Sequence, residues 1–355
     1  MYRRAPVFRF ILIALTCLTP LSAHTAETPE PVQEVTNFDS FELPEWFKVS
    51  FLDLSEDNLE ATEDNKHLVV FFWQEFCAYC KNTIEKNLTQ QSIRQMFDAH
   101  FDVVALNIWG DREVYGLDGE ETTEKEIARS LNVQFTPTII FFNAEGQPVL
   151  RLNGHVSPPE MQMALNYVQT KTYESQTIFE YLAANQPQAV NTQLNTQPFI
   201  DNGTNLDTVG QPKAILFEQT NCPDCDTFHR CVLSLDSVRD RFKRFQTVQL
   251  DMWSSTPVTA PSGQTTTAHD LAREMNIIYA PSLVLFDSNG SEMIRVESQL
   301  RSFHTEAVLE YIADGIYQRE PNFQRYIEER GDIIRAKVEQ GKTTNTRDIC
   351  PELYE

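Results

Sequence analysis

The chain has 355 residues, which is enough for two or three domains. Hydrophobic residues make up 41% and charged residues 23%, as in ordinary globular proteins. The formal net charge of −22 repels polyanions, so we expect neither nucleic acid nor an anionic membrane surface as a partner. Neutral or basic protein surfaces are the partners that this charge favours.

The first 23 residues have the layout of a secretory signal peptide. Arginines stand at positions 3, 4 and 9, an apolar stretch covers residues 10–18, and small residues follow at Ser22 and Ala23. The apolar stretch is too short to span a bilayer. We therefore expect an exported chain, cleaved after Ala23 or Ala26, with a flexible mature N-terminus over residues 24–42.

Two apolar stretches each lead into a pair of cysteines with two residues between them. The stretches cover residues 69–76 and 214–221, and the pairs are Cys77 with Cys80 and Cys222 with Cys225. A short apolar run bounded by polar residues favours a buried strand, and the apolar spacing over residues 81–97 predicts a helix. The first cysteine of a pair then lies at a helix N-terminus, where free N–H groups and the helix dipole favour a thiolate.

The rest of the first half alternates between predicted strands and helices. An acidic helix is expected over residues 54–65, with Ser55 or Asp53 as its N-cap. The elements expected after the first cysteine pair are strands over 101–108, 138–142 and 149–152, a turn at 143–146, and helices over 123–131, 158–167 and 173–184. This order predicts a small α/β domain over residues 43–184.

Residues 185–212 are rich in Gln, Asn, Thr and Pro and are predicted to be a linker. The second half then repeats the first at an offset of 145 for the cysteine pairs and 144 from Trp109 onward. At that offset Trp109 matches Trp253, Asn132 matches Asn276, Pro137 matches Pro281 and Gly146 matches Gly290. The period is far too long for a solenoid, so we infer a tandem duplication. The second domain is expected over 213–340, including a C-terminal helix over 323–339, with a tail over 341–355.

A cysteine pair on the first turn of a helix can exchange disulfides. The exposed first thiolate attacks a substrate disulfide, and the second cysteine resolves the mixed disulfide. A lone pair of this spacing can also be half of a zinc site. Here a proline follows the first cysteine of each pair by 60 and 59 residues, at Pro137 and Pro281, just before an apolar strand.

In these features the sequence resembles the thioredoxin superfamily. The resemblance implies that Pro137 and Pro281 are cis-prolines packed against the cysteine pairs, and that the preceding residues, Thr136 and Ala280, bind the substrate chain. A trans proline that starts a strand is the alternative. Trp73 resembles the thioredoxin tryptophan near the active site and is expected to contact substrate, whereas the second copy has Glu218 there.

Three segments narrow the resemblance to the SoxW-type periplasmic thioredoxins. They are residues 43–47, 107–114 and 131–138. The similarity covers residues 43–181 well and residues 213–335 as a more divergent copy. It implies a periplasmic protein that keeps partner thiols reduced, with electrons from a membrane thiol carrier.

The sequence also departs from the thioredoxin pattern. Many thioredoxins have a carboxylate six residues before the first cysteine, but Phe71 and Leu216 stand at those positions. Proton transfer is therefore expected to use water, Glu75, Glu218 or another group. Asp224 places negative charge beside Cys222, which favours a higher thiol pKa and a more reducing second site. We expect electrons to flow from the second site to the first site or its substrates.

The remaining cysteines leave two interpretations open. Cys222, Cys225, His229 and Cys231 supply ligand types that suit zinc, but they lie largely on one helix, so we expect no metal. His229 is expected on a helix surface or half-buried. Cys231 is either a buried apolar residue or the disulfide partner of Cys350.

Taken together, the sequence predicts two thioredoxin-like α/β domains in tandem, each a central mixed sheet flanked by helices. The expected activity is that of a thiol:disulfide oxidoreductase without metal or organic cofactor, acting on client proteins that carry disulfides or thiols. Cys77 and Cys222 are the expected nucleophiles, and Cys80 and Cys225 the resolving thiols. The alternatives are a disulfide oxidase or isomerase, or a second domain that binds clients as a chaperone-like module. Trp109 is expected to pack beside the sheet, with a substrate-facing loop as its alternative.

Overall fold

A computed structural model of the chain describes residues 31–33, 41–185, 193–201, 203–206, 210–298, 301–340, 344–346 and 350. The predicted signal peptide over residues 1–23 lies outside the described residues, as does most of the range 24–42. No helix among the described residues is long and apolar enough to cross a membrane.

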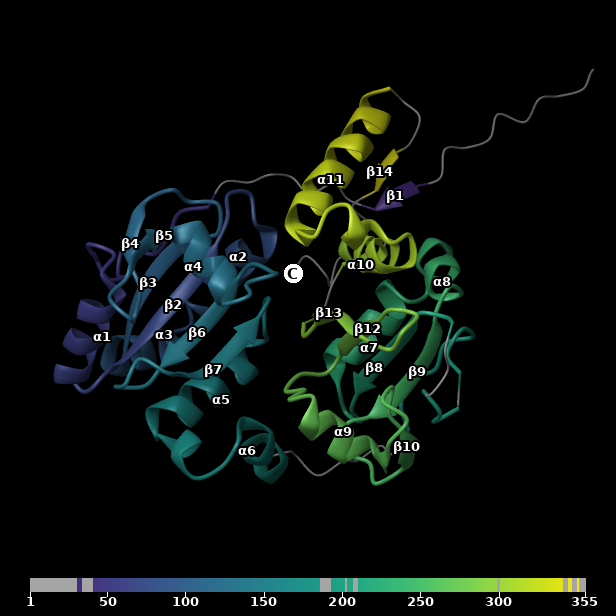
Figure 1. The fold of residues 1–355 in the computed structure, drawn as a ribbon, viewed down its shortest axis with the longest axis horizontal. Helices are drawn as coiled ribbons and strands as arrows, with labels where there is room; N and C mark the ends of the chain where they lie inside the picture. The colour runs from purple at the N-terminus through teal and green to yellow at the C-terminus, as the bar shows by residue number, and fades with distance from the viewer. Residues whose placement is uncertain are drawn as a thin grey trace, which may run out of the picture.

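The first domain is built on a four-stranded mixed sheet (Figure 1). Its strand order is β3-β2-β6-β7, with β2 parallel to β3 and antiparallel to β6, and β6 antiparallel to β7. The strands are β2 (His67–Trp73), β3 (Phe101–Asn107), β6 (Thr138–Phe142) and β7 (Pro148–Asn153), beside a hairpin of β4 (Glu113–Tyr115) and β5 (Glu121–Thr123). Because β2 is central, its first six residues are all buried.

Helices cover both faces of this sheet. They are α1 (Leu54–Glu63) and α4 (Glu124–Ser130) on one face, and α3 (Gln91–His100) and α5 (Pro158–Gln169) on the other. Side chains alternate along β2, so Val70 and Phe72 pack with α1 and α4 while Val69 and Phe71 pack with α3 and α5. Asp53 caps α1 as predicted, accepting from the Glu56 N–H at 3.0 Å.

The single helix predicted over residues 81–97 is wrong. The helix α2 (Ala78–Asn82) runs into a π-helical turn, η1 (Thr83–Asn87), and the chain turns before α3 begins at Gln91. In this region the Asn87 side chain donates to the Val156 carbonyl at 2.8 Å. That bond comes from a distant part of the chain, so the local apolar period could not reveal it.

The second domain repeats this arrangement. Its sheet has the order β9-β8-β12-β13, with the same parallel and antiparallel pairs as the first. The strands are β8 (Lys213–Glu218), β9 (Gln246–Asp251), β12 (Ser282–Phe286) and β13 (Glu292–Val296), with a hairpin of β10 (Pro257–Thr259) and β11 (Thr265–Thr267). The helices are α7 (Pro223–Cys231), α8 (Asp236–Phe242), α9 (Ala268–Glu274), α10 (Ser302–Ala313), η3 (Ile316–Gln318) and α11 (Phe323–Glu339).

Residues 197–201 and 203–206, which fall in the range predicted as a linker, pack on the second domain. The Phe199 ring stacks on Phe242 with their centroids 4.6 Å apart. Leu206 is fully buried, and its N–H donates to the Thr259 carbonyl at 3.0 Å. The second copy therefore begins before β8, although its described residues include no counterpart of α1. A short parallel pair, β1 (Pro31–Gln33) with β14 (Thr344–Thr346), lies outside both main sheets.

The two domains pack against each other through equivalent residues. The Asn153 side chain donates to the Glu297 carboxylate at 2.5 Å, and these positions are 144 residues apart. Phe135 packs against the core of the second domain, and Tyr279, also 144 residues later, packs into the core of the first. Reciprocal contacts of this kind characterise an interface between two copies related by a two-fold axis.

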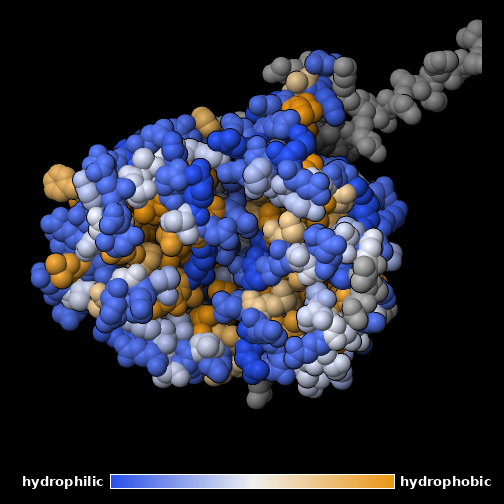
Figure 2. All heavy atoms as spheres, viewed as in Figure 1, coloured by the Kyte–Doolittle hydropathy of each residue, from blue (hydrophilic) through white to orange (hydrophobic). Residues whose placement is uncertain are grey.

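The helix that follows the last core helix of each domain reaches the other domain. In the first domain this helix is α6 (Ile178–Asn185), which follows the short turn η2 (Thr172–Glu174). Its Phe179 is buried in the second core, 4.9 Å from the Trp253 ring. In the second domain it is α11, whose Phe323 lies 5.5 Å from the Phe135 ring. Figure 1 shows α6 beside α9 and α11 beside α10, and Figure 2 shows a mostly hydrophilic surface on this face.

Candidate active site

The first cysteine pair lies where β2 passes into α2. Cys77 is the N-cap of α2 and is joined to Cys80 by a disulfide of 2.11 Å. The backbone N–H of Cys80 donates to the Cys77 sulfur at 3.0 Å. Cys80 is fully buried, whereas Cys77 keeps 6% of its surface exposed. On reduction, the same N–H stabilises a thiolate at Cys77, which is the sulfur that a substrate can reach.

The predicted proline loop lies against this pair. The Thr136–Pro137 peptide bond is cis. The carbonyl oxygen of Thr136 lies 3.4 Å from the Cys77 sulfur. The fold therefore brings together Cys77, Cys80, Thr136 and Pro137, although the two pairs of residues are far apart in the sequence.

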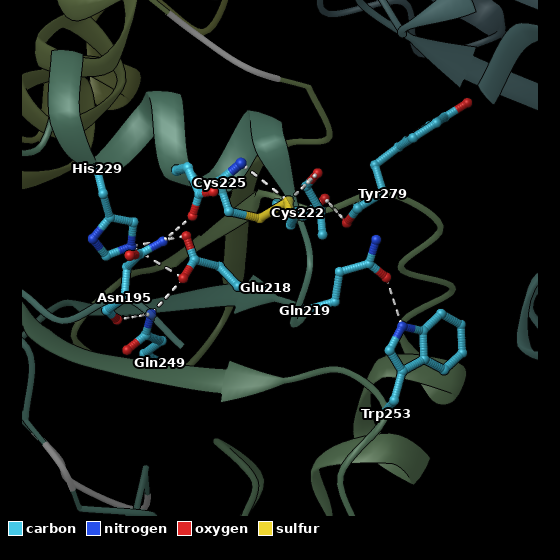
Figure 3. Close-up of a disulfide and its surroundings, with 12 residues drawn as sticks. Asn195, Glu218, Gln219, Cys222, Cys225, His229, Gln249, Trp253 and Tyr279 are labelled. Atoms are coloured by element: carbon cyan, nitrogen blue, oxygen red, sulfur yellow. Dashed lines mark hydrogen bonds and ion pairs between the residues drawn. A yellow bond between two sulfur atoms is a disulfide. The ribbon is translucent and has the colours of Figure 1, made fainter. Parts of the chain in front are cut away.

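The second cysteine pair has the same local geometry (Figure 3). Cys222 is the N-cap of α7, is bonded to Cys225 at 2.03 Å, and accepts from the Cys225 N–H at 3.0 Å. The Ala280–Pro281 bond is cis, and the Ala280 carbonyl oxygen lies 3.4 Å from the Cys222 sulfur. Both halves of the duplication thus hold a complete pair of cysteines beside a cis-proline loop.

The residue before each pair has a left-handed backbone. Asn221 has φ of 57°, which asparagine tolerates, but Phe76 has φ of 58°, where a bulky side chain is strained. Phe76 also keeps 48% of its surface exposed. A strained and exposed aromatic residue next to Cys77 marks this loop as a functional surface.

The two sites differ in their surroundings. Cys77 and Thr136 line a cleft of about 840 Å³ between the domains, whose far wall is formed by α10 and α11. Cys222 is not part of that lining, although its exposed fraction of 5% is close to the 6% of Cys77. Tyr279, just before the second proline loop, points away from the disulfide and into the first domain (Figure 3). The first site therefore faces the interdomain cleft, while the first domain packs around the second site.

A buried polar cluster lies behind the second disulfide. Glu218 is 1% exposed, and its two carboxylate oxygens accept from Nε2 of His229 at 3.0 and 3.1 Å. Gln249 donates to the same carboxylate, and Gln197 contacts Nδ1 of His229 at 3.3 Å. Figure 3 shows Glu218 between the disulfide and His229. The expectation of a surface or half-buried His229 is wrong, because the Glu218 partner satisfies a buried imidazole.

Trp73 occupies the position equivalent to Glu218 but is not part of the cleft lining. Its ring packs edge-on against Phe41, with the centroids 5.7 Å apart. Side chains alternate along β2, so Trp73 shares the face of Val69 and Phe71 and packs on the core of the first domain. The structure thus gives Trp73 a packing position outside the cleft lining, and its contact with substrate stays a prediction.

Trp109 lines the cleft instead. The residue is 36% exposed, and its ring Nε1 donates to the Gln74 side chain at 2.8 Å. Trp253 makes the equivalent bond to Gln219 at 2.7 Å, but Phe179 packs on its ring. The geometry therefore favours the substrate-facing alternative for Trp109 and a packing role for Trp253.

Tyr79, between the two cysteines of the first pair, contacts the second domain. Its hydroxyl accepts from the Arg301 N–H at 3.0 Å and lies 3.3 Å from Nδ1 of His304. Burial lowers the pKa of His304 to about 3, so this imidazole is neutral and its Nδ1 can accept a hydrogen bond from the Tyr79 hydroxyl. The sequence contains no local signal for this contact, because the start of α10 lies in the other domain.

The two remaining cysteines are bonded to each other. Cys231 of α7 and Cys350 of the tail form a disulfide that closes a sequence separation of 119 residues, and both are buried. The cysteines of the zinc-like pattern are therefore divided between two disulfides. In the part of the chain that the structure describes, no group of three or more His, Cys, Asp and Glu side chains is placed to hold a metal ion.

Comparison with known proteins agrees with this geometry. Residues 54–169 and 205–313, more than half of the chain, match the family model described as a thioredoxin-like domain. The chain belongs to this family. No protein of curated function matches it.

Solved structures resemble single domains of the chain. A thioredoxin-fold protein from Helicobacter pylori is 20% identical, with 36% of this chain and 91% of that chain covered and a TM-score of 0.30. A thioredoxin from Thermus thermophilus is 25% identical, with coverages of 34% and 85% and a TM-score of 0.28. The C-terminal domain of Neisseria meningitidis DsbD is 14% identical, with coverages of 33% and 91% and a TM-score of 0.24. The family and the two cysteine pairs fit a thiol:disulfide oxidoreductase in general.

Proposed function

We propose that the protein reduces disulfides of exported client proteins in the periplasm, and that clients react at the first site. One observation carries the proposal. Cys77 combines a helix N-terminus, a hydrogen bond from the Cys80 N–H at 3.0 Å and a neighbouring cis-proline loop with a position on the wall of the interdomain cleft. A stabilised thiolate on the wall of a cleft, beside a fully buried partner, is the arrangement that attacks disulfides.

The exchange proceeds in two steps. The Cys77 thiolate attacks one sulfur of the client disulfide, which forms a mixed disulfide and releases the other client sulfur as a thiolate. The Cys80 thiolate then attacks the Cys77 sulfur, which forms the Cys77–Cys80 disulfide and releases the second client thiolate. Two electrons pass from the protein dithiol to the client, and solvent supplies the protons taken up by the client thiols.

The second site supplies electrons to the first in this proposal. Its Cys222–Cys225 dithiol reduces the Cys77–Cys80 disulfide by exchange and is itself reduced by a membrane thiol carrier. Asp224 beside Cys222 supports this direction, because its negative charge disfavours the thiolate and makes the pair more reducing. The similarity of residues 43–47, 107–114 and 131–138 to SoxW-type periplasmic thioredoxins supports the same cellular role.

Reduction of insulin by dithiothreitol tests the division of labour. We expect Cys77→Ser to lower the catalysed rate about 100-fold or more, because Cys77 is the only cysteine among the described residues that line the cleft. Cys222→Ser should keep most of the rate, since dithiothreitol can reduce the first pair directly. If Cys77→Ser reduced insulin as fast as the wild type, clients would not react at the first site.

The direction of transfer is tested by equilibrating each pair with glutathione. The first pair is measured in the double variant Cys222→Ser/Cys225→Ser, and the second in Cys77→Ser/Cys80→Ser. We expect a low reduction potential for both cysteine pairs, with the lower of the two at the second pair. A strongly oxidising first pair would instead favour the disulfide oxidase, and a second pair more oxidising than the first would reverse the electron flow.

A further inference from the structure

The cleft in front of Cys77 has walls from both domains. On the first domain it is lined by Cys77, Thr136 and Trp109, and on the second by residues of α10 and α11, among them Phe303 and Ile327. Its volume of about 840 Å³ lies within the range of pockets that enclose most of a small ligand. A client segment that reaches Cys77 through this cleft therefore also contacts the second domain.

Hydrogen bonds hold α11 against both active-site loops of the first domain. The Gln324 side chain accepts from the Gln74 amide at 3.0 Å and donates to the Gln134 carbonyl at 2.8 Å. Gln74 in turn accepts from Nε1 of Trp109 at 2.8 Å. Gln74 lies three residues before Cys77 and Gln134 two residues before Thr136, so α11 is placed relative to the reacting sulfur itself.

The wall is also fixed within its own domain. Arg330 of α11 pairs with Glu306 and Glu310 of α10, each at 2.8 Å. The Tyr326 hydroxyl donates to Glu310 at 3.0 Å. These partly buried contacts join the two helices into one surface.

The side chains that line the cleft favour clients with apolar groups over clients of a particular charge. Four charged side chains line the cleft, and two are acidic and two basic: Glu75, Glu328, Arg325 and Arg335. Large apolar side chains from both domains line the same cleft as the reacting sulfur, namely Phe76, Trp109, Phe303 and Ile327. Phe76 is held exposed in a strained backbone, which is typical of a residue kept for contact with a ligand.

We propose that α11 forms the far wall of the client site, so that the second domain selects the clients of the first disulfide. The client is an extended polypeptide segment with a large apolar side chain next to its cystine. This inference rests on the proposed function, because the segment is the one whose disulfide Cys77 attacks. The second domain then has two roles, as a redox centre and as a specificity wall.

Two peptides and a matched pair of variants test the wall. The peptides share one disulfide-closed ring and differ in a single residue beside the first cysteine, Phe or Ser. Pre-reduced full-length protein in the Cys222→Ser/Cys225→Ser background is mixed with each peptide, and the second-order rate of its oxidation is measured. We expect at least a tenfold preference for the Phe peptide, the size of discrimination that an apolar pocket provides.

The substitution Ile327→Ser should lower this preference at least threefold. The control is Ile333→Ser, the same change on the same helix at a position that is 49% exposed and outside the cleft lining. A preference ratio is insensitive to a loss of folded protein, which would slow both peptides equally. Equal ratios for Ile327→Ser and Ile333→Ser, or no preference in the parent protein, would overturn the inference.

A small neutral substrate separates this inference from the function on which it rests. 2-Hydroxyethyl disulfide offers almost no surface to α11, so its rate reports the reactivity of Cys77 itself, and it should stay within about twofold in Ile333→Ser. If the reduced protein failed to react with this compound and with both peptides, the proposed function would be wrong. If all three substrates reacted but the ratio of the two peptide rates were unchanged in Ile327→Ser, the proposed function would stand and only the role of α11 in selecting clients would be wrong.

Discussion

At the scale of single residues, the duplicated sites differ most at the position four residues before the first cysteine. The first copy has Trp73, which packs on Phe41, and the second has Glu218, buried at 1% exposure with His229 as its partner. A buried carboxylate without hydrogen bonds is costly, so the cluster of His229, Gln249 and Gln197 is what allows Glu218 to stay there. Its place beside the second disulfide keeps Glu218 a candidate for proton transfer at Cys225.

Substituting one member of this pair should destabilise the protein. We expect Glu218→Leu to lower the free energy of unfolding by about 3–5 kcal/mol, because it leaves the buried imidazole of His229 without its partner. Urea unfolding followed by circular dichroism measures the loss. The double variant Glu218→Leu/His229→Phe should regain most of it, since an apolar pair needs no partner. A loss below about 1 kcal/mol in the single variant would show that the pair is not needed for folding.

At the scale of elements, α7 is the helix on which the second half depends. Its N-cap is Cys222 of the redox pair, and it ends at Cys231, which is bonded to Cys350 of the tail. The first cysteine is at the N-terminus, where the helix favours a thiolate, and the last is fully buried in the core with no exposed surface. One helix thus carries a reactive disulfide and a structural one, separated by their positions along it.

The tail disulfide should contribute to stability. A bond that closes 119 residues restricts the unfolded chain, so we expect Cys350→Ser to lower the free energy of unfolding by about 2–4 kcal/mol. Urea unfolding under non-reducing conditions provides the measurement. Cys231→Ser/Cys350→Ser serves as the control, and it should lose a similar amount if the cross-link is what matters. Unchanged stability in both variants would show that the tail adds nothing to the fold.

At the scale of the whole molecule, the two domains meet as two copies would in a symmetric dimer. Asn153 donates to Glu297, the residue 144 positions later. Phe135 packs on the core of the second domain, and its equivalent Tyr279 packs in the core of the first. The symmetry is broken where it concerns function, because the first site faces a cleft and the second is packed against the other domain. The same interface therefore places the first pair at a cleft and the second pair beside packed residues of the first domain.

This interface contains a carboxyl group that should make stability depend on pH. Burial raises the pKa of Glu160 from 4.5 to about 7, and the Asp224 carboxylate of the second domain adds to this, against the hydrogen bonds that Ser157 donates. The folded protein then binds more protons than the unfolded chain between pH 4.5 and 7. The contribution of Glu160 is present in full below pH 4.5 and is lost as the pH rises through about 7.

Comparing Glu160→Gln with the wild type isolates this effect. The difference in unfolding free energy between the two proteins should change across pH 4.5–7, with the wild type losing stability relative to the variant as the pH rises. Burial lowers the pKa of His155 to about 4, which produces the opposite slope, but it is common to both proteins and cancels. Glu329→Gln, an exposed change on α11, is the control. A difference independent of pH would contradict the raised pKa.

Much of the fold follows from local patterns in the sequence. Apolar runs, caps and turns predict β6 and α11 with their observed bounds, and Ser55 or Asp53 as the cap of α1, of which the structure has Asp53. The cysteine pairs, together with the resemblance to thioredoxins that their prolines carry, predict both redox sites. These features depend on neighbouring residues or repeat at a constant offset, so they can be recognised in the sequence without knowledge of the tertiary structure.

Tertiary structure decided what surrounds those sites. The break in the helix after Cys80, the burial of His229 against Glu218 and the packing of Tyr79 on α10 all come from residues distant in the sequence. The cleft beside Cys77 has walls from both domains, so it exists only because two similar domains face each other. The sequence by itself determined two thiol pairs with different neighbouring residues. Docking of the domains decided which pair lines a cleft, because the surroundings of a sulfur depend on everything packed around it.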